Sequence, residues 1–296
     1  MNPKHIILTL LLHTMNPKHI ILTLLLMLCP IGMAAQSTIT RHKPKPAVTK
    51  PKPAAKPKAK PAPRRNSSTT GLSAELNKLI NNMVYVSGGT FIMGGDDSSD
   101  QMPTHSVTLS SYYICKYEVT QALWRAVMGS NPSNFKGNNL PVENVSWYDC
   151  QTFIKRLNSY TGRDFRLPTE AEWEFAARGG NYSRHYKYSG SNNLDDVAWY
   201  IDNSNKRPHP VGTKQPNELG LYDMSGNVGE WCSDWDGSYS SYSQTNPTGP
   251  NSGSFRVHRG GFWRYNARYC RTPERNSKTP DYCVNYLGLR LVLSQL

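Results

Sequence analysis

A proline-rich basic tract divides this chain into a part that can fold and a part that cannot. Residues 41–65 read RHKPKPAVTKPKPAAKPKAKPAPRR and consist almost entirely of Lys, Pro and Ala. Proline lacks an amide hydrogen and fixes its own φ angle, so this tract cannot build a helix or a sheet. It predicts an extended linker with polyproline-II character over residues 36–70. Folding is therefore confined to residues 71–296, a length that suits one domain.

The positive charge of the chain is concentrated before the domain. The formal net charge is +13, yet residues 1–65 hold 12 of the bases and no acid, which leaves 22 bases and 21 acids for the remainder. A nucleic-acid-binding fold carries its charge on a folded face, so we expect no nucleic-acid partner. The linker is either a plain spacer or a basic arm that contacts an anionic surface of the cell envelope.

The first 35 residues have the features of an export signal. Lys18 precedes the apolar run Ile20 to Leu28, and the small-residue stretch Gly32 to Gln36 follows. This order is typical of a cleaved signal peptide, and the run is too short to span a bilayer. We therefore expect a periplasmic, cell-surface or secreted protein. A lipoprotein anchored at Cys29 is the less favoured alternative, because the bulky Leu28 precedes that cysteine.

The start of the chain is duplicated. Residues 1–12, MNPKHIILTLLL, recur identically as residues 15–26. Repeats that build solenoids have longer periods, so this copy is not a structural repeat. It predicts that residues 1–14 are a duplicated start and that Met15 is the working initiator.

The cysteines exclude one class of site and leave another open. Five remain after the predicted signal peptide, namely Cys115, Cys150, Cys232, Cys270 and Cys283. An odd number in an exported chain leaves at least one thiol without an internal partner. The sequence has no CxxC pair and no His/Cys cluster at zinc spacing, which argues against a structural zinc site.

Three helices can be predicted from their start signals. Thr120 caps a helix that ends at Gly129, Ser146 caps a second, and Thr169 forms a capping box with Glu172 in a third. The other expected elements are an amphipathic entry segment at 72–83 and strands at 84–86, 91–93, 105–109, 112–117 and 287–292. Because apolar runs are short and Gly, Asn, Ser and Tyr are abundant, we expect a loop-rich α+β domain.

Seven ordered blocks of the domain carry a family resemblance. They read VYVSGGTFIMG at 84–94, YEVT at 117–120, PVENVSW at 141–147, FRLPTEAEWEFAARGG at 165–180, NELGLYDMSGNVGEW at 217–231, RGG at 259–261 and GLR at 288–290. Together they resemble the formylglycine-generating enzyme, or sulfatase-modifying factor, family over almost the whole domain. The resemblance implies the formylglycine-generating fold, a loop-rich α+β fold related to C-type lectin domains.

One Gly/Asn-rich loop of this family pattern has the composition of a calcium site. Asp223 and Glu230 are carboxylates that either cap turns or fold around a hard cation such as Ca²⁺. The resemblance implies calcium, with the Asp223 and Glu230 side chains and the Gly226 and Val228 carbonyls as ligands. The family's other calcium site falls where this chain is short, at 199–211, so we expect a single ion.

The thiol pair that the family uses for catalysis is incomplete. Family enzymes oxidise a target cysteine to formylglycine with oxygen and a copper ion held by two cysteines. Here Cys270 stands at the second position, but Tyr265 stands at the first. A phenol is hard and mostly protonated, so it cannot replace a thiolate toward copper(I) and copper is doubtful. Cys283 could replace the missing ligand or form a disulfide with Cys270, or both thiols could stay free and buried.

The segment around Cys270 has a second interpretation as a binding surface. Residues 262–286 are crowded with aromatic, amide and arginine side chains, which are typical of binding surfaces. The segment resembles the variable region of ligand-binding proteins that retroelements diversify on this same fold. It predicts an exposed concave surface for a protein or glycan ligand, formed by Trp263, Tyr265, Asn266, Tyr269, Arg275 and Tyr286. The alternative is ordinary packing around a former active site.

Two functions follow from these patterns. The favoured one is an exported, non-catalytic binding or envelope module on the formylglycine-generating scaffold. The alternative is a formylglycine-generating-type oxidoreductase that modifies cysteine in sulfatases or related targets. Substrate-pocket positions of the family also differ, since Gly229 and Tyr286 stand where Trp and Asn are expected, whereas an arginine remains at Arg275. The missing thiol at position 265 favours the binding module.

Overall fold

The computed structural model describes residues 67–294, so the predicted signal peptide, the duplicated start and most of the linker lie outside the described residues. The helices are α3 (Ser67–Asn81), α4 (Gln121–Met128), α5 (Trp147–Thr161), α6 (Glu170–Ala177) and α7 (Leu194–Val197), with short 3₁₀ turns η2 (Ser99–Gln101), η3 (Gly180–Tyr182) and η4 (Ala267–Cys270). Between residues 67 and 294, none of the helices has the length and apolar composition that crossing a bilayer requires.

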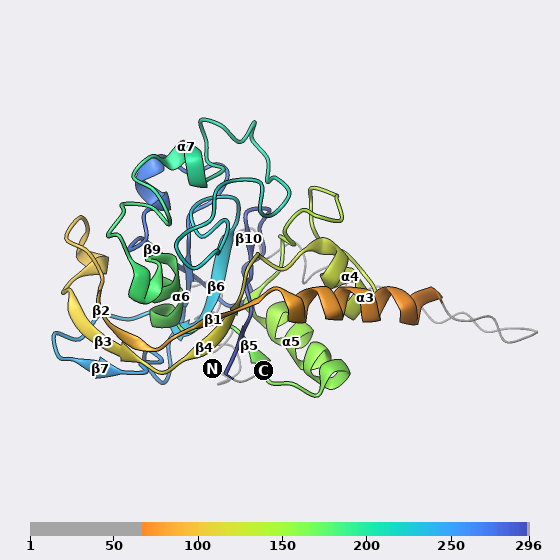
Figure 1. Ribbon diagram of the computed structural model, residues 1–296, viewed down its shortest axis with the longest axis horizontal. Coiled ribbons are helices and arrows are strands. Elements are labelled where there is room, and N and C mark those ends of the chain that lie inside the picture. The colour runs from red at the N-terminus through yellow and green to blue at the C-terminus, as the bar shows by residue number, and fades with distance from the viewer. Residues whose placement is uncertain (1–66, 295–296) are drawn as a thin grey trace, which may run out of the picture. The chain divides into compact units, whose positions relative to one another are not determined.

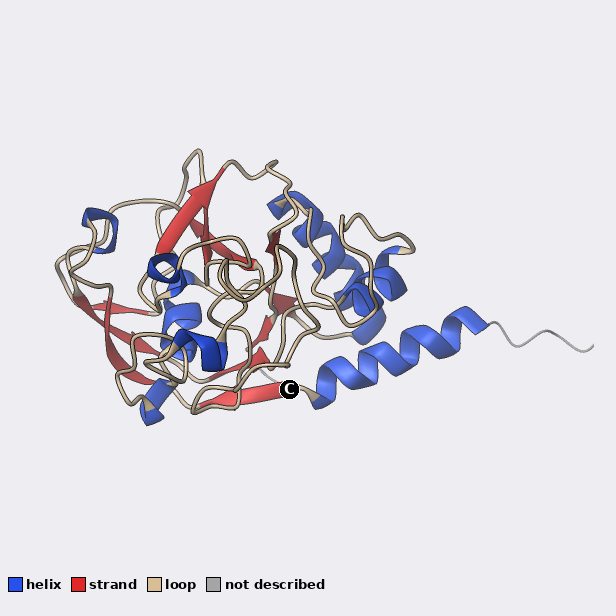
Figure 2. Ribbon diagram, turned by 90° about the horizontal axis from the view of Figure 1, so that it is seen from above, coloured by secondary structure: helices blue, strands red, loops and turns tan. Residues whose placement is uncertain are grey.

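Eleven short strands form three small sheets within the described residues. The strands are β1 (Met83–Val86), β2 (Gly89–Met93), β3 (His105–Leu109), β4 (Tyr112–Cys115), β5 (Phe165–Arg166), β6 (Gly229–Trp235), β7 (Gln244–Thr245), β8 (Arg256–Arg259), β9 (Arg275–Lys278), β10 (Leu287–Gly288) and β11 (Val292–Leu293). The sheet orders are β1-β4-β11-β5, β10-β6-β8-β9 and β2-β3-β7. Long loops join these elements, and Figure 2 shows how much of the domain they occupy. The expectation of a loop-rich α+β fold is confirmed.

The three predicted helix starts are confirmed by their capping hydrogen bonds. The Thr120 side chain accepts from the amide of Leu123, and Gly129 ends α4 in the left-handed region at φ 80°. Ser146 and Thr169 each form a reciprocal capping box with the acidic residue three positions later. These caps satisfy amide groups that no helical carbonyl can reach, so the boundaries follow from local sequence.

Two expected boundaries are wrong. Helix α3 begins at Ser67, so the last four residues of the expected linker are helical. The expected strand at 287–292 is two separate strands, because Leu287–Gly288 pairs with β6 whereas Val292–Leu293 pairs with β4 and β5. Between them Arg290 turns its fully buried side chain to Glu230 instead of continuing a ladder.

Two apolar clusters form most of the core. One gathers around α4 and α5, where the rings of Trp124 and Phe153 stack in parallel at 4.8 Å between centroids. The other surrounds α6, which packs against β2, β3, β6 and β8. Figure 1 shows α3, α4 and α5 on one side of the domain and the β2-β3-β7 sheet on the other, with α6 and β6 between them.

Helix α6 is unusual because all eight of its residues are buried, three glutamates included. Each glutamate meets an arginine. The pairs are Glu170 with Arg275, Glu172 with Arg166, and Glu174 with Arg259 and Arg178. Buried carboxylates require such partners, because an unpaired charge in the interior is costly. The arginines therefore connect α6 to strands on both sides of it.

Candidate functional site

A sharp glycine turn positions the segment that carries Cys270. Gly260 and Gly261 both have left-handed backbones, with φ angles of 98° and 68°. A Cβ on Gly261 would lie 2.5 Å from the carbonyl oxygen of Tyr269 and 2.9 Å from the Cys270 sulfur. Only glycine allows this close return of the chain. The Arg-Gly-Gly block therefore folds residues 262–270 back on themselves.

Cys270 lies in the interior without a second thiol beside it. It is fully buried in a small apolar cluster with Tyr188, Leu194, Val197, Ala198 and Tyr200. Burial raises the pKa of its thiol to about 12, so the sulfur is protonated at neutral pH. Burial therefore disfavours the thiolate of Cys270, which is the form that binds metals.

Tyr265, at the position of the family's first cysteine, belongs to an aromatic stack. Its ring centroid lies 3.6 Å from that of Phe262 and 4.8 Å from that of Tyr269. On the other face of Phe262, Tyr286 stacks nearly parallel at 3.8 Å, and its hydroxyl lies 3.1 Å from that of Tyr282. We call the half-exposed residues Tyr265, Tyr269, Tyr282 and Tyr286 the tyrosine patch.

Two exposed arginines flank the tyrosine patch. The Arg264 guanidinium lies 5.5 Å from the Tyr286 ring centroid, and the Arg268 guanidinium lies 5.7 Å from that of Tyr269. Asn266, also exposed, lies between them. Four of the six residues expected to form the ligand surface therefore do gather at one partly exposed place, namely Tyr265, Asn266, Tyr269 and Tyr286.

Two members of the expected ligand surface lie elsewhere. Trp263 is only 6% exposed, donates its indole hydrogen to the Asn285 carbonyl at 3.0 Å, and packs edge-on against Phe135. Arg275 is also buried and binds Glu170 through two hydrogen bonds of 2.8 Å. The expectation that these two side chains line an exposed patch is wrong, because each has its polar atoms satisfied inside the domain.

Cys283 does not approach Cys270. Its sulfur lies 3.9 Å from a carboxylate oxygen of Asp149 and 3.5 Å from the carbonyl of Asp281, on the surface near the start of α5. All five cysteines of the described residues are free thiols, and Cys283 alone among them is exposed. The structure therefore has two free thiols, but the expectation that both are buried is wrong for Cys283, which lies on the surface.

The expected calcium loop leads into a buried cluster of charges. Glu230 accepts hydrogen bonds from the Arg290 guanidinium, the shortest 2.7 Å, and from the Trp173 indole at 2.7 Å. The Asp223 Oδ2 atom accepts from the Gly212 amide at 2.7 Å, but its Oδ1 atom is buried and has no hydrogen-bond partner among the described residues.

Glu118 joins this cluster from a distant segment. Its carboxylate accepts from the side chain of Asn227 at 2.7 Å and from the amide of Val228 at 3.0 Å. Sequence reasoning did not select Glu118 as a site residue, although it lies in the YEVT block that carries the family resemblance. It lies over 100 residues from Asp223, so local spacing gave no signal that the two carboxylates meet.

The cluster holds more negative than positive charge. Three buried carboxylates, Glu118, Asp223 and Glu230, face the single guanidinium of Arg290. Burial raises the pKa of Asp223 to about 6, and burial together with the charges of Asp223 and Glu230 raises the pKa of Glu118 well above its usual value. An excess of carboxylates and an unpartnered oxygen suit a hard cation, although Glu230 is already committed to Arg290.

Side chains alone do not make a metal cage here. In residues 67–294, no group of three or more His, Cys, Asp or Glu side chains is arranged to hold a metal ion. The expected calcium set differs from such a group, because it combines two carboxylates with the carbonyls of Gly226 and Val228. Gly226 is held left-handed at φ 83°, and a Cβ there would clash with the carbonyl of Trp199.

The thiols provide a direct check of this geometry. A thiol reagent at pH 8 should label Cys283 in the native protein and should label Cys270 only after denaturation, because reaction needs an exposed thiolate. Mass spectrometry of proteolytic peptides would assign the label to each cysteine, and Cys283→Ser is the matched control. Native labelling of Cys270 at a rate similar to that of Cys283 would contradict the enclosed position of its sulfur.

Comparisons with known proteins agree with this fold. Residues 69–295 match the family described as the sulfatase-modifying factor enzyme 1-like domain. The chaperone protein LppX of Paenibacillus barcinonensis is 38% identical over 231 residues, covering 61% of this chain and 78% of that protein. The formylglycine-generating enzyme of Mus musculus is 32% identical over 248 residues, covering 76% of this chain but only 64% of the enzyme's own length.

A solved structure extends the likeness to three dimensions. Treponema denticola variable protein 1 superposes with a TM-score of 0.68 and 36% sequence identity, covering 72% of this chain and 95% of that one. The family match spans nearly all of the described residues, and the blocks that carry it hold the caps, turns and buried charges of the fold. This chain therefore belongs to the sulfatase-modifying factor enzyme 1-like family.

Proposed function

We propose that this protein is an exported, non-catalytic binding module of the cell envelope. The observation that carries the proposal is the arrangement at positions 265 and 270. Tyr265 stacks on Phe262 where the family has a copper-binding cysteine, and the remaining Cys270 is buried and protonated. One enclosed thiol cannot supply the two soft ligands that copper(I) takes in this family.

The tyrosine patch supplies what a binding surface needs. Tyrosines offer large and rigid contact areas with a polar tip, and the arginines beside them are the side chains that binding hot spots favour. Arg264 and Arg268 form no ion pair with a carboxylate of the described residues, so their charges are available to a partner. The proposed ligand is therefore a protein or glycan that contacts this patch.

Two relatives support a role in binding. LppX of Paenibacillus barcinonensis is named a chaperone protein, and a chaperone has to bind another protein. The structural relative from Treponema denticola is named a variable protein. In this chain, substitutions at the tyrosine patch would change a surface without disturbing the core. The proposed export rests on the signal-like residues 18–36, and the basic linker is proposed to lie against an anionic envelope surface.

Calcium is proposed as a structural ion. The support is the unpartnered Asp223 oxygen together with the excess of buried carboxylates over Arg290. A bound Ca²⁺ would take oxygens from Asp223, Glu230 and the carbonyls of Gly226 and Val228, and its charge would also offset that of the nearby Glu118. The ion would hold the loop that contains Asn227. The carbonyl of Asn227 accepts a hydrogen bond from the Trp263 amide, so this loop supports the segment that carries the tyrosine patch.

The absence of catalysis can be tested directly. Purified protein supplied with copper and oxygen should not convert a sulfatase-type cysteine peptide to formylglycine, because Tyr265 removes one thiolate ligand. A family enzyme with both cysteines is the positive control, and mass spectrometry of the peptide detects the loss of sulfur. Turnover by this protein that Cys270→Ser abolishes would show that it is an enzyme and would reject the proposal.

The binding surface predicts a pattern of natural variation. In the same gene from many isolates, substitutions should concentrate at exposed or half-exposed positions of the segment, such as Tyr265, Asn266 and Arg268. Buried Trp263 and Cys270 should stay unchanged, because their contacts hold the backbone. Sequencing the gene across a population measures this. Variation that is spread evenly over the domain, or that strikes buried positions as often as exposed ones, contradicts a selected surface.

Calcium should raise the thermal stability of the domain. A ligand at about 100 times its Kd adds about 2.7 kcal/mol, which for a domain of this size raises the melting temperature by about 5–10 °C. The gain should vanish in Asp223→Asn, which removes a carboxylate, and should persist in Asp164→Asn, which changes an exposed carboxylate far from the cluster in sequence. Equal midpoints with calcium and with a chelator in the unmodified protein would reject the site.

A further inference from the structure

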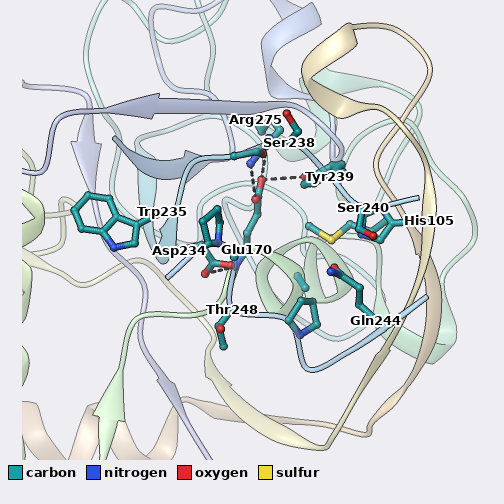
Figure 3. A pocket seen from close by; sticks show the side chains of 16 residues that line it. His105, Glu170, Asp234, Trp235, Ser238, Tyr239, Ser240, Gln244, Thr248 and Arg275 are labelled. Carbon is teal, nitrogen blue, oxygen red and sulfur yellow. Dashed lines mark hydrogen bonds and ion pairs between the residues drawn. The ribbon is translucent and has the colours of Figure 1, made fainter. Parts of the chain in front are cut away.

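One concave site shares no lining residue with the tyrosine patch or with the expected calcium loop. The cavity has a volume of about 380 Å³ and opens between the start of α6, the end of β6 and the strands β2 and β3. Its outer wall is the loop between β6 and β8, which supplies nine lining residues between Gly237 and Pro250. Figure 3 shows side chains from all of these elements around one space, which we call the β6–β8 pocket.

The wall loop has the composition of a binding loop. Residues 237–254 read GSYSSYSQTNPTGPNSGS, with no charged and no aliphatic side chain. The loop is nevertheless held in place, because β7 within it pairs with β3. Asn246 adds two hydrogen bonds to Ser110, one to the amide at 2.8 Å and one to the hydroxyl at 3.0 Å. A fixed loop of Ser, Tyr, Asn and Gly provides adaptable hydrogen bonds on a rigid support.

The strongest charges of the pocket are already neutralised within the domain. Arg275 binds both carboxylate oxygens of Glu170, and its third nitrogen donates to the carbonyl of Gly237 at 2.9 Å. The Tyr239 hydroxyl donates to the same Glu170 carboxylate at 3.0 Å. The charges of Arg275 and Glu170 therefore neutralise each other. Among the described residues, no unpaired cation lines the pocket to attract an anionic ligand.

Two hydrogen-bond acceptors remain unused. Asp234 is 3% exposed, and its Oδ2 atom accepts from the Glu170 amide at 3.0 Å and the Ser233 hydroxyl at 2.8 Å, whereas its Oδ1 atom bonds to no described residue. His105 is 4% exposed and directs Nδ1 to the Pro103 carbonyl. Because a carbonyl oxygen can only accept, Nδ1 carries the hydrogen and Nε2 of the neutral ring is left as an acceptor.

The remaining lining groups can both donate and accept, or are apolar. The amide of Gln244 makes no side-chain hydrogen bond within the described residues, and the hydroxyls of Ser240 and Thr248 lie on the same wall. Met93 and Pro247 give the cavity an apolar surface. Buried acceptors without donors are costly, so the pocket favours a ligand that brings several donors and no negative charge.

We propose that the β6–β8 pocket binds one neutral sugar residue. A sugar ring is uncharged, donates several hydroxyls to acceptors such as Asp234 Oδ1 and His105 Nε2, and has apolar C–H surfaces that suit Met93 and Pro247. The cavity volume falls in the range of small-molecule sites, which combine an apolar lining with a few oriented polar groups. This site does not depend on the tyrosine patch, so it adds a small-molecule specificity to the proposed binding module.

The test uses the full chain and a panel of simple sugars. Methyl glycosides of glucose, galactose and mannose, together with N-acetylglucosamine, are titrated to about 10 mM with saturation-transfer NMR, a range that covers millimolar Kd values. At least one of these neutral sugars should bind saturably. Glucuronate carries a negative charge on the same ring as glucose. It should bind at least about tenfold more weakly than glucose methyl glycoside or any neutral sugar that binds.

Variants of the pocket separate this site from the rest of the protein. Asp234→Asn and Gln244→Ala should each weaken sugar binding about tenfold, the effect of losing one hydrogen bond between the protein and the sugar. Tyr242→Ala is the matched control on the same loop, since Tyr242 is 80% exposed and lies outside the pocket. Tyr265→Ala should also leave sugar binding unchanged. The sugar test therefore gives the same result whether or not the tyrosine patch binds a ligand.

Three results would overturn the proposal. They are no saturable binding of any neutral sugar in the panel, unchanged binding in both Asp234→Asn and Gln244→Ala, and glucuronate binding as tight as that of the neutral sugars. Melting curves of the two pocket variants show whether they fold. If Asp234→Asn does not fold, Gln244→Ala decides alone. This variant should fold, because the side-chain amide of Gln244 makes no hydrogen bond within the described domain.

Discussion

Buried pairs of glutamate and arginine fix how the helices and strands of this domain lie against one another around its two apolar clusters. The central helix α6 supplies three of the glutamates, and Glu230 of β6 supplies a fourth that binds Arg290. Removing one partner of such a pair costs about 3–5 kcal/mol, since the other charge stays buried. Three pairs join segments that are distant in the sequence, namely Glu170 with Arg275, Glu174 with Arg259, and Glu230 with Arg290. The loops between them can then vary in length and composition without loss of the core.

The same rule distinguishes the buried carboxylates that have a candidate role. Glu118 and Asp223 must share the charge of Arg290 with Glu230, and a cation would restore the balance. Asp234 has no ion pair and turns one oxygen toward the β6–β8 pocket, and burial followed by the charge of Glu170 raises its pKa to about 7. Glu143 is also buried without an arginine; it accepts from the amide of Phe135, its Oε2 atom has no partner among the described residues, and it lies at neither candidate site. Buried acids without an arginine therefore occur at both candidate ligand sites but do not by themselves mark a site.

The segment after Gly261 illustrates how a fixed scaffold can carry different side chains. Its backbone is set by the glycine turn and by β10, while inward-facing Phe262 and Cys270 fill the interior. Between these fixed points, the side chains at 264–266 and 268–269 are exposed or half-exposed. Replacing a thiol by Tyr265 within that frame adds a ring to an aromatic stack and leaves the fold unaffected. Family membership therefore specifies the scaffold more firmly than it specifies the chemistry.

Local sequence determined the parts of this protein that depend on near neighbours. The caps at Thr120, Ser146 and Thr169 and the family blocks predicted the helices and the fold class, because capping bonds and tight turns are made within a few residues. The sequence also showed that position 265 lacks its thiol. Tertiary structure decided which side chains meet. It buried Trp263, moved Arg275 to Glu170, brought Glu118 to Asp223 and enclosed the β6–β8 pocket. These outcomes rest on contacts across 22 to 175 residues of chain, and no local pattern carries that information.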